Sequence, residues 1–109
     1  MAPVWLAPRT HRTEFPGVAI PAEILRLVRA GRLEDTSWHN NVCPSFTVSG
    51  NTGVRLWVGE DNPADREVPG DRRFTVSLYE DDGTWLGVAE STDCVVEVLE
   101  YLADHWDVS

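Results

Sequence analysis

A continuous pattern over residues 74–106 constrains the fold of this chain more than any other feature. Apolar and polar residues alternate over 74–79 and again around Leu86 and Val88, as in two strands that bury one face. The intervening Asp-Asp-Gly at 81–83 supplies turn residues, because glycine adopts a positive φ without steric cost. The pattern predicts a β-hairpin that leads directly into a helix.

The predicted helix follows because the apolar period changes from two to 3.6 residues after residue 94. We expect Ser91 and Thr92 to cap its start, since a hydroxyl oxygen accepts a hydrogen bond from an unpaired N–H of the first turn. One side of the helix is apolar: Val95, Val98, Leu99, Leu102 and Trp106. The opposite side, the acidic stripe, is a candidate partner surface: Asp93, Glu97, Glu100, Asp104 and Asp107.

The N-terminal residues 1–20 are expected to form an extended arm, because each of their prolines lacks a backbone donor and disfavours helix before it. Residues 21–109 are expected to form a single domain. Pro21 suits the first turn of a short helix, and Gly31 is its expected C-terminal cap. This helix carries the basic residues Arg26, Arg29 and Arg32.

A second hairpin is predicted over residues 46–58, with its turn at 50–53, and a long loop follows over 59–72. The chain is therefore expected to adopt an α+β fold. It would have an antiparallel sheet of three to four strands in two consecutive hairpins, the C-terminal amphipathic helix on one face and a short N-terminal helix. The residues expected to face the C-terminal helix are Phe46, Val48, Val54, Leu56, Val58, Phe74, Val76, Leu78, Leu86 and Val88.

Strand alternation places large polar and aromatic residues on the other face of the sheet. Two interpretations stay open for this face: a second core layer under the N-terminal helix or arm, or a binding surface. We expect a homodimer, because one long helix covers only one face of a sheet. The residues proposed for self-association are Trp5, Arg55, Trp57, Tyr79 and Trp85.

The segment 33–44 is the least regular and the richest in reactive side chains. Its candidate ligand-binding residues are Asp35, Trp38, His39, Asn40 and Cys43. A thiol nucleophile would need Cys43 with His39 as base and Asp35 to orient the imidazole, but these residue types are common. No phosphate-binding or nucleophile-elbow motif occurs, and no paired cysteines suggest zinc. We therefore expect no metal and no cofactor, and a non-enzyme is favoured over a minor enzyme.

Charge is distributed unevenly along the chain, whose formal net charge is −9. Residues 1–40 hold five arginines and four acids, whereas residues 41–109 hold four arginines and fourteen acids. The negative charge of residues 41–109 repels nucleic-acid phosphates and anionic lipids and favours a basic protein partner. The helix–strands–helix order resembles the double-stranded-RNA-binding fold and small immunity or adaptor folds, but the acidity argues against RNA.

The predicted location is cytoplasmic, because the start of the chain lacks the apolar run of a signal peptide and no apolar stretch is long enough for a membrane span. Cys43 and Cys94 are accordingly expected to be reduced thiols. The leading hypothesis is a small acidic cytoplasmic interaction module of the immunity, inhibitor or adaptor type. The alternative is a small-ligand-binding protein or minor enzyme that uses residues 35–43.

Overall fold

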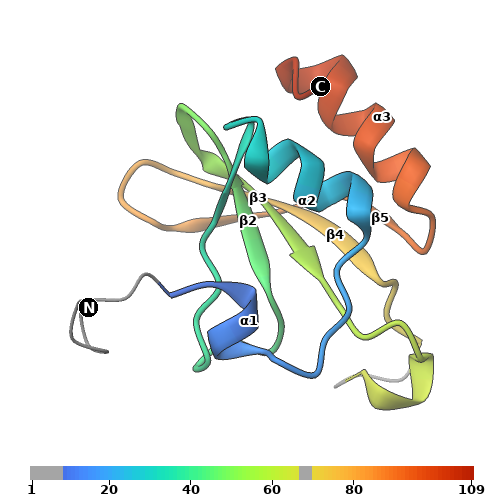
Figure 1. The fold of residues 1–109 in the computed structure, drawn as a ribbon. Coiled ribbons are helices and arrows are strands. Elements are labelled where there is room, and N and C mark those ends of the chain that lie inside the picture. The colour runs from blue at the N-terminus through green and yellow to red at the C-terminus, as the bar shows by residue number, and fades with distance from the viewer. Residues whose placement is uncertain (1–8, 67–69) are drawn as a thin grey trace, which may run out of the picture.

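The fold is an antiparallel five-stranded sheet with helices packed against it, seen in a computed structural model that describes residues 9–66 and 70–109 (Figure 1). The strands follow one another in sequence order across the sheet. They are β1 (Leu33–Asp35), β2 (Ser45–Val48), β3 (Asn51–Val58), β4 (Phe74–Tyr79) and β5 (Trp85–Thr92). The helices are α1 (His11–Glu14), α2 (Ala22–Arg29) and α3 (Val95–Trp106), and a short 3-10 helix, η2, covers Pro63–Asp65.

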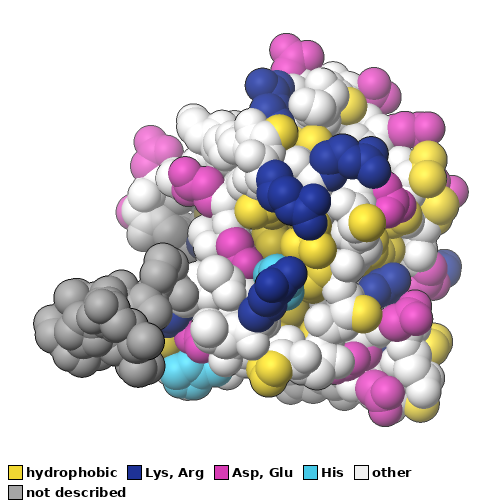
Figure 2. Space-filling model, viewed as in Figure 1, with side chains coloured by type: hydrophobic (Ala, Val, Ile, Leu, Met, Phe, Trp, Pro, Cys, Tyr) yellow, Lys and Arg dark blue, Asp and Glu magenta, His cyan; other side chains and the backbone are white. Residues whose placement is uncertain are grey.

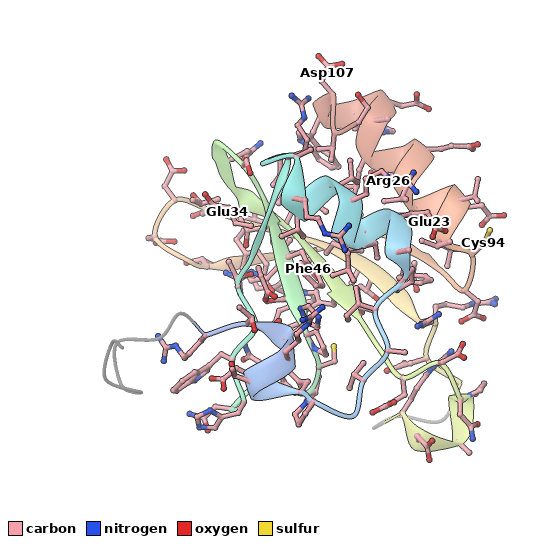
Figure 3. All side chains as sticks on the ribbon, in the orientation of Figure 1. Glu23, Arg26, Glu34, Phe46, Cys94 and Asp107 are labelled. Carbon is pink, nitrogen blue, oxygen red and sulfur yellow. The ribbon has the colours of Figure 1, made fainter. Side chains whose placement is uncertain are left out.

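Two helices share one face of the sheet. Helix α2 packs on β1, and α3 packs on β4 and β5. Their apolar sides meet the alternating residues of the strands in a single core, so that Ile24 of α2 and Leu102 of α3 are both fully buried. Phe46 of β2 lies beneath the helical layer (Figure 3). The predicted α+β fold is confirmed, with the C-terminal helix on one face and a short helix before the strands.

The sheet has five strands rather than the expected three to four. The additional strand is β1, which lies in the segment expected to be irregular and pairs antiparallel with β2. Three residues are too few to show alternation in a sequence. The N-terminal stretch expected to be extended also contains the one-turn helix α1. Trp5, a proposed contact residue, lies outside the described residues.

The start of α3 differs from the predicted cap. Ser91 and Thr92 remain in β5, and the N-cap is Cys94. The Thr92 hydroxyl nevertheless acts at this junction, since its oxygen accepts from the Cys94 N–H at 3.1 Å and the hydroxyl donates to Glu97 at 2.6 Å. The predicted cap was wrong because β5 continues through Ser91 and Thr92, and only Asp93 and Cys94 separate it from the helix.

The strand β5 contains two irregularities that sequence alternation did not reveal. Tyr79 pairs with Trp85 but Leu78 pairs with Gly87, so Leu86 is an extra residue on β5. Ala89 is a second extra residue, because Ser77 pairs with Val88 and Val76 with Glu90. The bulges turn Leu86 and Val88 away from the core, and both are exposed. Their predicted place under the C-terminal helix was wrong.

Candidate functional site

The segment 35–39 is held by α1. Asp35 accepts hydrogen bonds from the His11 backbone N–H and from the Ser37 N–H, and its carboxylate lies 2.8 Å from His11 Nδ1. Burial raises the pKa of Asp35, but these hydrogen bonds outweigh burial and hold the pKa below its usual value. The carboxylate is thus engaged in fixing the N-terminal helix to β1.

Trp38 and His39 belong to the same contact. The Arg9 guanidinium lies over the Trp38 ring at 4.1 Å, and His39 Nδ1 lies 3.2 Å from a Glu14 carboxylate oxygen. A cation over an indole face is an attractive arrangement. Of the five predicted ligand-binding residues, Asp35 and His39 therefore contact α1, and Trp38 contacts Arg9 just before it.

The other two predicted residues, Asn40 and Cys43, line a different feature. A hollow of about 590 Å³ lies between the 40–43 loop and the long 59–73 loop, with Trp57 and Thr75 of the sheet in its wall. The predicted ligand-binding residues therefore do not form one site: the first three contact the N-terminal segment around α1, and the last two line the hollow. Alternation along the chain could not reveal that division, because it depends on where α1 lies.

The long loop is held in place by arginines that no sequence pattern grouped together. Arg66 donates to the carbonyl oxygens of Glu60, Asp61 and Asp71, and its guanidinium also contacts Asp93 at 3.0 Å. Asp93 further accepts from the Arg73 backbone N–H and from the guanidinium of Arg72. These contacts, the Arg73 N–H foremost, hold the pKa of Asp93 below its usual value.

The predicted acidic stripe is consequently divided. Asp93 belongs to the arginine cluster of the long loop. Asp107 adopts a left-handed backbone conformation at the end of α3, where its carbonyl oxygen accepts from Arg32. The remaining three members lie exposed on the helix: Glu97, Glu100 and Asp104.

The acidity extends beyond the helix itself. Residues 74–109, which form β4, β5 and α3, contain nine carboxylates and no lysine or arginine. Exposed arginines lie instead on α2, where Arg26 and Arg29 face solvent. Figure 2 shows basic side chains over α2 in the middle of the view, with acidic side chains both beside them and around the rim. The last 36 residues thus form a part of the chain that carries only acidic charge.

The open face of the sheet, opposite the helical layer, carries four of the residues proposed for self-association. The Arg55 guanidinium lies 5.5 Å from the Trp57 ring centre and 4.9 Å from that of Tyr79. Trp85 pairs with Tyr79 across the strands and is 61% exposed. Neither α2 nor α3 covers this face, because their buried residues share one core on the opposite side.

Within the described residues, no three histidine, cysteine, aspartate or glutamate side chains are grouped as metal ligands, and no helix is long and apolar enough to cross a membrane. Comparison of the chain with protein-family models, with curated proteins and with solved structures finds no match.

Proposed function

We propose that this protein is a small interaction module that binds a basic protein partner through the acidic part formed by β4, β5 and α3. The observation that carries the proposal is the charge of that part, where nine carboxylates occur in 36 residues without one lysine or arginine. Complementary charge accelerates encounter and selects among partners. An immunity protein, inhibitor or adaptor has to find one partner quickly and select it from others.

The carboxylates Glu97, Glu100 and Asp104 contribute most directly, because all three side chains are exposed on α3. The span from the first to the last is seven residues, or roughly 10 Å at 1.5 Å per residue. Arg66 and Arg72 neutralise Asp93 but neither contacts these three residues. A partner can therefore reach them without breaking an internal ion pair that the structure contains.

Affinity capture from a cell lysate tests the proposal when the wild-type protein is compared with a Glu97→Gln, Glu100→Gln, Asp104→Gln variant. We expect wild-type protein to retain basic proteins at low salt and release them at high salt. Salt screens the attraction between exposed charges, with a screening length of about 10 Å at 0.1 M that shortens as the salt concentration rises. The variant should retain much less. Equal capture of the same basic proteins by the folded variant would contradict the proposal.

A second candidate function, binding of a small ligand, is favoured by the hollow that Asn40, Cys43 and Trp57 line. Its volume of about 590 Å³ lies within the range of small-molecule sites. A fragment screen by protein-observed NMR tests this candidate. Shifts that gather at Asn40 and Trp57 and disappear in Asn40→Ala would support it, and fragments that bind elsewhere would count against it.

Homodimer formation through the open face and a cytoplasmic location stay predictions. The open face supports the first, because Trp85 is solvent-exposed beside Tyr79. Light scattering over a wide concentration range tests it. A monomeric mass throughout, unchanged in Trp57→Ser, would show that the open face does not join two copies.

A further inference from the structure

The strand β5 is the long free edge of the sheet. In the described part of the chain β5 pairs with β4 alone, and β1 is the other outermost strand. The two edges differ in length, since β1 has three residues and β5 has eight. Edge strands present unpaired backbone donors and acceptors that another chain can join, and a long edge offers more of them.

The apolar surface of the molecule gathers at this edge. Of the five most exposed large apolar residues in the described part, Trp85, Leu86 and Val88 belong to β5, and Val96 lies in the first turn of the following helix. The bulges at Leu86 and Ala89 place Leu86 and Val88 outward rather than in the core. Proteins usually protect edges with lysine, proline or very short strands. None of these occurs in β5, although its two bulges are a further device that protects edges.

One outer position already has a partner. The Ser91 N–H donates to the Glu90 carboxylate at 2.9 Å, which satisfies a donor near the C-terminal end of the strand. The part of the edge that remains for another chain is therefore Trp85 to Glu90. It is long enough for a segment of about five or six residues, which has to follow the two bulges at Leu86 and Ala89.

Charge selects the occupant of this edge. Glu80, Asp81 and Asp82 precede β5 at the hairpin turn, Glu90 lies within it, and the acidic helix α3 follows and packs on it. A second copy of this chain would bring an equally acidic surface to the same place, and the like charges would repel. A basic segment would gain attraction at both ends of the strand.

We propose that the β5 edge binds an extended segment of a basic partner protein by strand addition. The segment alternates apolar residues, which contact Trp85 and Val88, with lysine or arginine, which approach the surrounding carboxylates. Backbone pairing supplies affinity, and the alternate side chains supply specificity. This inference rests on the proposed function and names the mode of binding and the chemistry of the partner.

A display library of random peptides, about ten residues long, is the probe. We expect selection on wild-type protein to enrich peptides that alternate apolar and basic residues. In Val88→Lys, their dissociation constant should rise by roughly tenfold or more, because the new charge repels the peptide and the apolar contact is lost. The matched control is Val42→Lys, which changes another exposed valine, at 68% exposure, in the loop before β2. It should leave the affinity within about twofold.

Backbone pairing is tested separately by N-methylation of alternate amides in a selected peptide, which removes donors and should also weaken binding by roughly tenfold or more. Basic, salt-sensitive peptides that bind Val88→Lys as well as wild type, or that tolerate N-methylation, would overturn strand addition and leave the proposed function standing. Enriched peptides without basic residues, or no enrichment, would overturn both. Self-association that Val88→Lys abolishes would assign the edge to a second copy and overturn the inference.

Discussion

The long loop should depend on one arginine far more than on its neighbour. Arg66 and Arg72 both contact Asp93, but the Arg66 side chain is 7% exposed and that of Arg72 is 61% exposed. Arg66 also donates to three backbone carbonyl oxygens, at 2.7 to 3.2 Å, and these belong to residues from both ends of the loop. Replacement of Arg66 by alanine leaves those carbonyls without their donor.

The magnitude follows from the number and exposure of these contacts. Each hydrogen bond contributes about 0.5–1.5 kcal/mol, so loss of the three carbonyl contacts should lower the free energy of unfolding by about 1.5–4.5 kcal/mol. The ion pair adds little, because Asp93 is half exposed and solvent screens it. Arg72→Ala, which removes one exposed ion pair, should cost less than about 1 kcal/mol.

Urea denaturation followed by tryptophan fluorescence measures both variants, since the chain contains five tryptophans. Hydrogen exchange should show that Arg66→Ala also opens the loop amides around Glu60 and Asp71, while Arg72→Ala leaves them protected. Equal destabilisation by the two substitutions, or a loss below about 1 kcal/mol for Arg66→Ala, would refute the reasoning from burial and bond number.

Two further predictions concern the body of the domain. Because the pKa of Asp35 is held below its usual value, the contacts of its carboxylate stabilise the fold above about pH 4 and are lost as the pH falls through the folded pKa. Asp35→Asn should therefore lower the thermal midpoint at neutral pH. The variant should also lose less stability than wild type on acidification, as measured by calorimetry across pH. Phe46→Ala, at a fully buried position, should cost about 3–5 kcal/mol in urea denaturation. In the same assay Val42→Ala, at an exposed valine, should stay within about 0.5 kcal/mol.

The regular elements could be predicted from sequence where a period extends over several residues. The 3.6-residue period placed α3 on the sheet, and alternation correctly put Phe46, Leu56 and Val76 in the core. Gly31 and Gly83 adopt positive φ at the two places where a helix end and a turn were expected. These features are local, so adjacent residues carry the information.

The errors arise where distant segments meet. The alternating pattern assigned Leu86 and Val88 to the wrong face of the sheet, because the bulges depend on how β5 pairs with β4. Asp93 was grouped with the acidic helix because a helical wheel does not include Arg66, which is 27 residues away and contacts the same carboxylate. The contact of α1 with Asp35 likewise joins residues 24 apart. Each is a tertiary contact without a local sequence signal.

The salt dependence of binding tests the central proposal most directly. The dissociation constant of a captured basic partner, or of a selected basic peptide, would be measured for wild-type protein and for the Glu97→Gln, Glu100→Gln, Asp104→Gln variant from about 50 to 500 mM salt. We expect wild-type affinity to fall by roughly tenfold or more over that range, and the variant to bind more weakly with a much smaller dependence on salt. A wild-type affinity that does not change with salt, or a variant with the same salt dependence as wild type, would contradict binding through the acidic part of the molecule.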